Sequence, residues 1–509
     1  MLAKVFSAAI LGVDGYLVDV EVDISFGLPG VTVVGLPDAA VQESRERVRS
    51  AIKNNGYTFP TYRTTVNMAP ADTRKNGPVF DLAIALGMLA ASEQIPQTHL
   101  DQFVMIGELS LDGNVRGVQG VLPFAIATQQ ANKKGLIVPY ENAAEAALIE
   151  GLDIYPVQNL KEAIQIVCEP ENAQIYKPQH DMTEERFMLD YSEVKGQNYA
   201  KRGLEIAAAG AHNLIMIGPP GSGKTMLARR LPSILPPMTL PECLETSKIY
   251  SITGKMSQGN RIIRQRPFRS PHHSISSAGL VGGSSIPKPG EVSLAHNGVL
   301  FLDELLEFRR EVLEVLREPL EDHVVSISRA QMRLSFPANF ILIASMNPCM
   351  CGYRGDLAKA CVCTVKQIDR YWNKLSGPLL DRVDIHLDIP RLQESELMQR
   401  QDSESSQAIR ERVVQAHHIQ LKRFEGSGIH SNSQMSPKHL KAYCQLDEIG
   451  QGLLQQAIRR LSLSARAYDR ILKVSRTIAD LDGETQIHAQ HLAEAIQFRT
   501  LDRQHMMAA

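Results

Sequence analysis

One short segment, residues 218–225, restricts the fold of this 509-residue chain more than any other. It reads Gly-Pro-Pro-Gly-Ser-Gly-Lys-Thr, and it lies between an apolar run at 214–217 and a segment of helical character that contains residues 226–231. Glycines between a strand and a helix let backbone N–H groups close around phosphate oxygens, and the lysine that follows can reach the β- and γ-phosphates. The segment therefore predicts a strand, a phosphate-binding loop and a helix within an α/β fold.

We predict that this loop binds ATP and that the Thr225 hydroxyl ligates Mg²⁺. The predicted nucleotide-binding residues are Gly218, Pro219, Pro220, Gly221, Ser222, Gly223, Lys224, Thr225 and Met226. A second apolar run, 299–302, is followed directly by Asp303 and Glu304. Parallel sheets bind ligands at the carboxyl ends of their strands, so Asp303 is expected to hold the Mg²⁺ shell. Glu304 is expected to orient and deprotonate the attacking water.

A third predicted strand, 340–345, ends close to Asn347. A neutral polar side chain at such a strand end can hydrogen-bond the γ-phosphate or the attacking water. The alternative is an asparagine that merely ends a strand, and Asn347 taken alone would favour that alternative.

The rest of the chain is organised around this centre. Its composition is 44% hydrophobic and 22% charged with a net charge near −2, which excludes a disordered chain and a uniformly basic nucleic-acid-binding protein. Residues 1–168 have mixed α/β periodicity, and 169–190 have the polar, proline-containing composition of a linker. Short apolar strands then alternate with longer segments over 191–392, which predicts a parallel sheet, and 393–509 have helical periodicity.

Between the two halves of the predicted site lies a basic insert, 246–290, which contains no aspartate or glutamate. A local positive field of this length suits contact with a DNA backbone without base readout. The alternative is a solvated loop that packs on a neighbouring subunit or meets its nucleotide. The predicted DNA contacts are Arg261, Arg264, Arg266, Arg269 and Lys288.

Four cysteines, Cys349, Cys351, Cys361 and Cys363, lie within the loop 349–363. Four thiolates can complete a tetrahedral Zn²⁺ site, although the single-residue spacing inside each pair is tighter than usual. The alternatives are free thiols or an oxidised pair, and oxidation is disfavoured in the cytoplasm, where we expect this protein because no secretion signal is evident.

The order of these motifs, with Leu-Leu-Asp-Arg at 379–382 and Ser-Ala-Arg at 464–466, resembles an AAA+ ATPase. Longer stretches are similar to the magnesium-chelatase-like branch and to the ComM family of bacterial competence proteins. These stretches are 194–202, 266–274, 289–296 and 376–384. The resemblance implies that Asn347 is the sensor 1 residue and Arg382 is an arginine finger that reaches into the neighbouring subunit. It also implies that Arg466 is the sensor 2 residue of a helical lid.

Two of these roles have alternatives within the chain. Arg382 could instead form an ion pair with Asp381 or Asp384, and Arg470 lies one helical turn from Arg466 and could replace it. An arginine that acts across an interface would make ATP hydrolysis depend on ring assembly. The resemblance implies a homo-hexameric ring.

Residues 70–82, 113–123 and 137–142 resemble the proteolytic domain of Lon. Where that family has its nucleophilic serine this chain has Val79, and where it has the lysine base our alignment places Leu122. Neither side chain can attack a carbonyl or accept a proton, so we predict a Lon-like fold without peptidase activity. Ser110 and Lys75 could replace the missing pair only with a new geometry.

The expected protein therefore has a Lon-like α+β domain (1–168), a linker (169–190), an AAA+ core (191–392) and a helical lid (393–509). By resemblance it is a branch-migration helicase that acts on single-stranded, forked or branched DNA in natural transformation, with recombination proteins as further partners. The alternatives are a metal-insertion motor for a tetrapyrrole and a protein remodeller. No membrane partner is expected, because no apolar run approaches the ~18–20 residues that span a bilayer.

Overall fold

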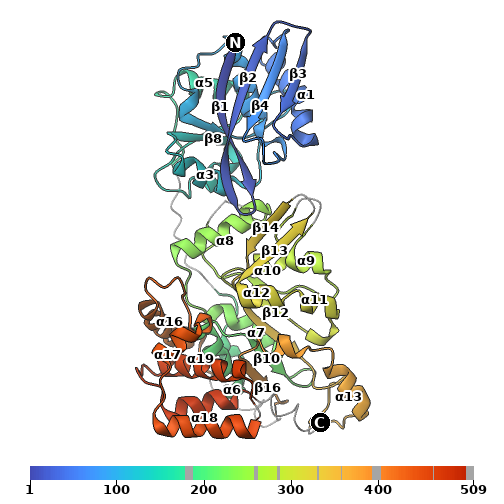
Figure 1. Ribbon diagram of the computed structural model, residues 1–509, viewed down its shortest axis with the longest axis vertical. Helices are drawn as coiled ribbons and strands as arrows, with labels where there is room; N and C mark the ends of the chain where they lie inside the picture. The colour runs from blue at the N-terminus through green and yellow to red at the C-terminus, as the bar shows by residue number, and fades with distance from the viewer. Residues whose placement is uncertain are drawn as a thin grey trace. The chain divides into compact units, whose positions relative to one another are not determined.

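The computed structural model describes residues 1–177, 187–256, 262–283, 287–329, 332–356, 358–392, 403–461 and 463–499. Its contacts divide the chain into two compact units (Figure 1). Unit 1 comprises residues 1–183 and 243–263, and unit 2 comprises residues 184–242 and 264–509. Arg261, one of the predicted DNA contacts, lies outside the described residues.

Unit 1 is built on a seven-stranded mixed sheet in the order β3-β4-β2-β1-β5-β8-β9. Its strands are β1 (Leu2–Leu11), β2 (Asp14–Ser25), β3 (Gly30–Val34), β4 (Arg63–Ala69), β5 (Phe103–Met105), β8 (Gly135–Pro139) and β9 (Asp153–Val157). In β2, Val18, Val20 and Val22 are buried while the acidic residues between them lie partly exposed. This is the one-sided alternation that the sequence predicted.

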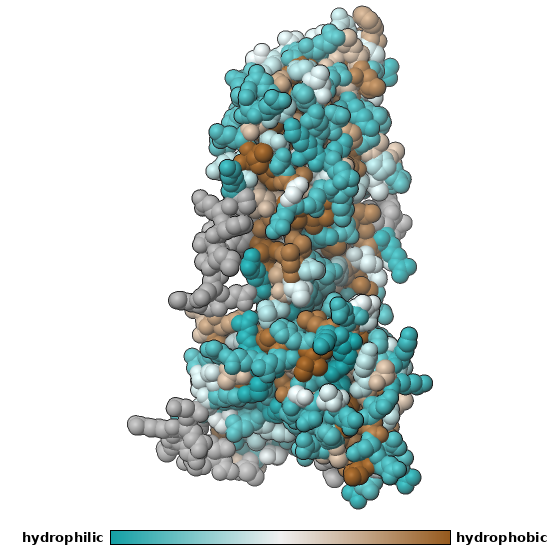
Figure 2. Space-filling model, turned by 90° about the vertical axis from the view of Figure 1, so that its left-hand side faces the viewer, coloured by the Kyte–Doolittle hydropathy of each residue, from teal (hydrophilic) through white to brown (hydrophobic). Residues whose placement is uncertain are grey.

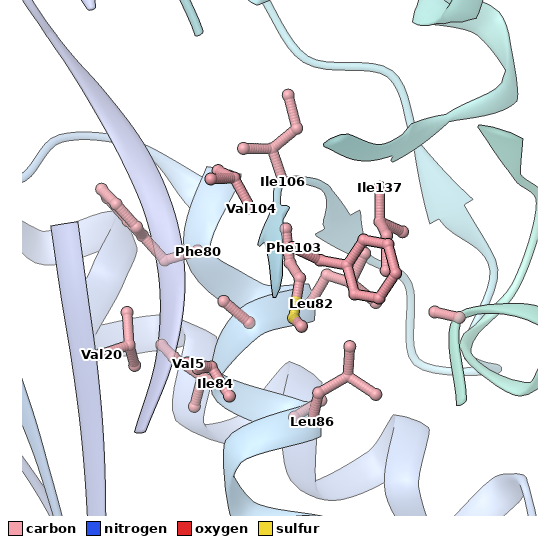
Figure 3. Packing of buried hydrophobic residues seen from close by; sticks show 14 of the residues in the cluster. Val5, Val20, Phe80, Leu82, Ile84, Leu86, Phe103, Val104, Ile106 and Ile137 are labelled. Atoms are coloured by element: carbon pink, nitrogen blue, oxygen red, sulfur yellow. The ribbon is translucent and has the colours of Figure 1, made fainter. Parts of the chain in front are cut away.

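Five helices within residues 1–177 bury their apolar residues in the core of unit 1. They are α1 (Ala39–Asn54), α2 (Asp81–Ala91), α3 (Val121–Gln130), α4 (Ala143–Ala146) and α5 (Leu160–Cys168). Every residue of α2 is buried, and a Cβ atom on Gly87 would lie 2.8 Å from Val22, so a glycine lets the helix approach β2. Figure 3 shows side chains of α2, β1 and β5 packed together in this core.

Residues 243–263 also belong to unit 1, which differs from their predicted place in a basic insert of the AAA+ core. They include most of α8 (Leu240–Ile252). Lys248 pairs with Asp14 at 2.9 Å, and Ser251 donates a hydrogen bond to the buried Glu145. Burial raises the pKa of the Glu145 carboxyl, against the lowering effect of this hydrogen bond. Both of these contacts lie within unit 1.

Unit 2 contains a five-stranded, wholly parallel sheet in the order β11-β12-β15-β10-β16. Its strands are β10 (Leu214–Ile217), β11 (Phe268–Arg269), β12 (Val299–Leu302), β15 (Ile341–Met346) and β16 (Ile385–Asp388). The predicted P-loop parallel sheet is therefore confirmed. The short strand β11 was not predicted, because its residues were assigned to the basic insert.

A separate antiparallel hairpin, β13 (Val324–Arg329) with β14 (Met332–Pro337), lies between β12 and β15 in the chain. The alternation of Val325 and Ile327, both buried, with less buried neighbours could have identified it. The only insert predicted from the sequence lies before Asp303, whereas this hairpin follows it.

The end of the described chain is helical, as the sequence predicted, with α16 (Ser406–Arg423), α17 (Pro437–Tyr443), α18 (Glu448–Leu461), α19 (Ala465–Leu481) and α20 (Ala489–Gln497). Helices α16 and α19 pack on α6 (Asn198–Gly210), which contacts β16. The apolar residues Ile471, Val474 and Ile478 form the buried stripe of α19. The mixed α/β fold with a helical lid is confirmed.

Hydrophilic residues predominate on the face of the molecule drawn in Figure 2, with hydrophobic residues in smaller patches. Among the helices of the described ranges, none has the length and apolar character of a membrane span.

Candidate active site

The phosphate-binding loop joins β10 to α7 (Lys224–Arg230). Gly221 and Gly223 have φ values of +78° and +91°, a left-handed backbone that glycine adopts without steric cost. A Cβ atom on Gly218 would lie 2.1 Å from the carbonyl oxygen of Ile389, so no side chain fits there. These three glycines account for the shape of the loop, which turns sharply from a buried strand into a helix.

Lys224 is held inside this loop. Its Nζ donates hydrogen bonds to the carbonyl oxygens of Gly218 at 2.7 Å and Pro219 at 2.9 Å, and to Asn347 Oδ1 at 3.4 Å. Burial lowers the pKa of the ammonium, although Asp303 and Glu304 oppose that effect. The contact with Asn347 brings the phosphate-binding loop and the end of β15 together, as the sequence predicted.

Asp303 follows β12 and receives hydrogen bonds from two hydroxyl groups. Thr225 Oγ1 donates to Asp303 Oδ2 at 2.7 Å, and Ser345 donates to Asp303 Oδ1. A carboxylate beside hydroxyl groups supplies the hard oxygen ligands that Mg²⁺ prefers, so Thr225 and Asp303 fit the ion. Ser345 was not predicted, although its place at the end of the predicted strand 340–345 was the available signal.

Glu304 adopts a left-handed backbone with φ of +52°, which costs roughly 1–3 kcal/mol for a residue other than glycine and is common at functional sites. Its backbone N–H donates to Asp303 Oδ1 at 3.1 Å. Its carboxylate lines the cavity beside the loop and is more than half exposed, so it can meet a water molecule.

His273, a residue of the basic insert, is a neighbour of Glu304. Its Nδ1 lies 3.8 Å from Glu304 Oε2. The segment reaches this position because β11 pairs in parallel with β12, so the residues that follow both strands lie at the same edge of the sheet. The imidazole lies against that of His272 in a tilted arrangement, with ring centroids 4.1 Å apart and the planes at 35°.

The phosphate-binding loop and the ends of β12 and β15 line one cavity of about 450 Å³, which is in the size range of small-ligand sites. The lining residues are Pro220, Gly221, Ser222, Gly223, Lys224, Thr225, Met226, Asp303, Glu304, Ser345, Met346 and Asn347. They come from the carboxyl ends of β10, β12 and β15, which are neighbours in the sheet. Most of the predicted nucleotide-binding residues therefore converge in one place.

Arg382 does not line this cavity. Its guanidinium pairs with Glu321 and donates to the Pro378 carbonyl at 2.7 Å, instead of forming the alternative ion pair with Asp381 or Asp384. Glu321 is more than half exposed, whereas the Arg382 side chain is only 12% exposed. The role of Arg382 at a neighbouring site stays a prediction.

The two candidate lid arginines on α19 differ in their partners. Arg470 pairs with the buried Asp384, which also accepts a hydrogen bond from His212. The pKa of Asp384 is held far below its usual range, since Arg470 and His212 outweigh the effect of burial. Arg466 is 56% exposed and lies 3.8 Å from Asp381, so it is the more available of the two.

Two predicted DNA contacts, Arg266 and Arg269, have partners within unit 2. Arg266 donates to the carbonyl oxygens of Pro236 at 2.7 Å and Asn297 at 2.8 Å and pairs with Glu242 at 3.1 Å. Arg269 makes two hydrogen bonds to Glu291, at 2.6 and 2.9 Å. Both guanidinium groups thus hold parts of unit 2 together.

Two other predicted DNA contacts, Arg264 and Lys288, are exposed.

The Lon-like positions show no catalytic pair. Val79 and Leu122 are buried in the core of unit 1. Lys75 donates to the carbonyl oxygens of Pro70 and Thr73. Ser110 bonds to Asp112 and to the carbonyl oxygen of Asn114. The candidate substitutes, Lys75 and Ser110, therefore bond to different partners.

The four clustered cysteines bring their sulfur atoms together directly after Asn347. Cys349 Sγ lies 3.3 Å from Cys351 Sγ and 3.6 Å from Cys361 Sγ. The backbone N–H of Cys351 donates to Cys363 Sγ at 3.4 Å. N–H groups of Tyr353 and Val362 lower the pKa of the Cys351 thiol to about 6. Against the lowering effect of the Cys363 N–H, desolvation and the neighbouring Cys351 and Cys349 sulfurs raise the pKa of the Cys361 thiol to about 12.

Three family models match successive parts of the chain. They are "Subunit ChlI of Mg-chelatase" over residues 20–142, "Magnesium chelatase, subunit ChlI" over 190–397 and "Magnesium chelatase, subunit ChlI C-terminal" over 403–499.

Curated relatives extend the similarity to nearly the whole chain. It is 47% identical over 508 residues to Competence protein ComM of Haemophilus influenzae, covering 99% of this chain and 98% of the relative. It is 45% identical over 507 residues to the uncharacterized protein YifB of Salmonella typhimurium, covering 99% of this chain and 98% of the relative. Lon protease 2 of Bacillus subtilis is 30% identical over 184 residues, which is 33% of this chain and 32% of the relative.

Proposed function

Because this chain belongs to the ComM and magnesium-chelatase-like family of AAA+ ATPases, we propose that it is an ATP-driven ring motor that acts on DNA. More narrowly, it is a branch-migration helicase that extends strand exchange in natural transformation and homologous recombination. The observation that carries this proposal is the identity, along almost the entire length of both chains, with a protein named for competence.

The cavity beside the phosphate-binding loop supports the ATP hydrolysis in this proposal. Lys224 would neutralise charge on the β- and γ-phosphates, and Thr225 and Asp303 would hold Mg²⁺. Glu304 would take a proton from the attacking water, and Asn347 would orient that water or the γ-phosphate. ATP and Mg²⁺ are the cofactors that the family implies.

The proposed assembly is a homo-hexameric ring in which Arg382 of one subunit completes the site of the next. The position of Arg382 outside the cavity of its own chain supports this assignment. The planar, permanently charged guanidinium would stabilise the charge that develops on the transferred phosphoryl group. Arg466 would complete the site from the lid.

The proposed DNA contacts are now Arg264 and Lys288, since Arg266 and Arg269 are engaged within unit 2. Both side chains are exposed, which a contact with phosphate requires. Contacts of this kind would track the backbone and would weaken as salt rises.

The decisive assay measures ATP hydrolysis by the full chain alone and with single-stranded, duplex or forked DNA, at about 50 mM and about 200 mM salt. We expect DNA, including forked DNA, to stimulate ATP hydrolysis several-fold. The higher salt concentration should reduce this stimulation. A double variant, Arg264→Ala with Lys288→Ala, should lose most of the stimulation at unchanged basal turnover. Lys438→Ala, which removes an exposed lysine of α17, is the matched control.

A rate of ATP hydrolysis that does not change with any of these DNAs would contradict the proposal that the protein is a DNA motor. The second candidate, a metal-insertion motor, would then be favoured, because all three family models are named for a subunit of magnesium chelatase. That candidate predicts ATP hydrolysis that responds to partner proteins and not to DNA.

A further inference from the structure

We propose that Cys349, Cys351, Cys361 and Cys363 bind one structural Zn²⁺ ion that positions the nucleotide site. The four sulfur atoms lie within 4.8 Å of one another. In a tetrahedral site with Zn–S bonds of about 2.3 Å, neighbouring sulfurs are about 3.8 Å apart. The observed separations of 3.3 and 3.6 Å are close to that value.

The donor set specifies the class of metal. Four thiolates favour a soft or borderline ion over Mg²⁺, and tetrahedral S₄ coordination is typical of Zn²⁺. An iron–sulfur cluster would need sulfurs spread around several iron atoms, whereas these sulfurs surround a single point. Four protein ligands leave no open coordination position, so the site would be structural and not catalytic.

The proposed zinc loop, residues 349–363, is anchored beside the active site at its first end. Cys349 follows Asn347 by two residues, and Asn347 accepts the hydrogen bond from Lys224. Gly352, with φ of +84°, packs against the phosphate-binding loop, because a Cβ atom there would lie 2.6 Å from Cδ of Pro220. The loop therefore contacts the residues that surround the phosphates.

Its second end is anchored by α13 (Val365–Trp372). Cys363 directly precedes Thr364, whose side chain caps this helix. From the other end of α13, Trp372 Nε1 donates to the Pro348 carbonyl at 3.0 Å. A metal bound to all four cysteines would join these two ends and hold Asn347 in its place. The cysteines thus act as positioning residues, and their effect on turnover rests on the proposed ATPase function.

The first test is the metal content of the full chain purified without chelators. We expect about one zinc per chain in the unmodified protein. The double variant, Cys361→Ser with Cys363→Ser, should contain little zinc. Cys168→Ser, a half-buried cysteine of unit 1, is the control and should keep its zinc. Iron with a visible colour, or far less than one zinc per chain in the unmodified protein, would overturn the zinc assignment.

The second test measures turnover and nucleotide affinity separately. Removal of zinc with a chelator should lower kcat at least tenfold with a smaller change in the dissociation constant for ATP, and added Zn²⁺ should restore kcat. Replacement by Co²⁺ should give the absorption of a tetrahedral thiolate site. The restoration distinguishes positioning from misfolding, because it returns the same molecules to activity.

The outcomes separate the two proposals. A zinc-free protein that hydrolyses ATP normally would overturn the positioning role. A zinc-loaded protein that never hydrolyses ATP would contradict the proposed function while it supports the metal site.

Discussion

Asp303 has both carboxylate oxygens engaged by hydroxyl groups, which fixes its orientation before any ligand arrives. Thr225 and Ser345 donate to opposite oxygens of that carboxylate, and the N–H of Glu304 donates to one of them. A carboxylate held in this way loses little conformational entropy when it joins the shell of a metal ion. Glu304, by contrast, makes few contacts and is free to meet a water molecule.

Changes of Glu304 and of Lys224 should therefore affect ATP hydrolysis and ATP binding differently. Glu304→Gln should lower kcat by about 100-fold or more, because the amide cannot accept a proton from water. It should still bind ATP, since the loop and Asp303 are intact. Lys224→Ala should lose both turnover and tight binding. Single-turnover kinetics and equilibrium titration with a fluorescent ATP analogue separate the effects, and normal hydrolysis by Glu304→Gln would refute its assignment as the base.

A buried histidine should make unit 2 sensitive to acid. Burial, with the nearby Arg266 as a smaller cause, lowers the pKa of His417 to about 4. The unfolded chain, with a pKa of about 6.5, therefore binds more protons below pH 6.5, so stability is lost as the pH falls toward 4. From pH 7 to pH 5 this loss should be about 2 kcal/mol in the free energy of unfolding.

His417→Gln should remove that component. Thermal unfolding at pH 7 and pH 5 should show a larger drop for the unmodified protein than for His417→Gln. His418→Gln, which changes an exposed neighbour, should behave like the unmodified protein. Equal drops for His417→Gln and the unmodified protein would contradict the assigned shift.

At the scale of elements, the site depends on which strands are neighbours. The apolar strands β12 and β15 are followed by polar residues and β10 by the glycine-rich loop, so the sequence predicts both the strands and the convergence of Lys224, Asp303 and Asn347. It does not predict β11, which has only two residues, or the role of Ser345, because one hydroxyl at a strand end is an unspecific signal.

The basic insert shows what a count of charges along the sequence leaves out. Its acid-free window ends just short of Glu291 and begins just after Glu242 and Glu245, yet Glu242 and Glu291 are the partners of Arg266 and Arg269. The partner of Lys248, Asp14, lies 234 residues away in sequence. Charge counted along a chain does not include partners that folding brings from outside the window.

Helix α19 is joined to its neighbours by a buried carboxylate, Asp480. It accepts hydrogen bonds from Arg423 at 2.7 Å, Arg476 at 3.0 Å and Asn432 at 2.8 Å. Asp480→Ala would leave two buried guanidinium groups without their anion, which should cost about 3–5 kcal/mol. Urea unfolding followed by circular dichroism measures this change. Glu425→Ala, at an exposed site, should cost little, and a cost below about 1 kcal/mol for Asp480→Ala would show that the network is dispensable.

At the scale of the whole molecule, the account makes each site a joint property of two subunits. The residues that bind and hydrolyse ATP lie together in one chain, whereas Arg382 lies outside their cavity. A dilute monomer should then bind ATP and turn it over very slowly. Hydrolysis should rise with protein concentration as rings form, which turnover assays and light scattering on the same samples can follow.

Subunit mixing tests this central claim most directly. The Arg382→Ala subunit keeps an intact ATP-binding pocket but lacks the arginine that it would offer to its neighbour. The Lys224→Ala subunit keeps that arginine but has a disabled pocket. Each variant alone should form rings of normal size that are nearly inactive. After exchange at equal amounts, about a quarter of all subunits would carry an intact pocket next to an intact arginine in a head-to-tail ring. The account predicts that the mixture regains about that share of normal ATP turnover. Turnover no higher than the average of the two variants would contradict it.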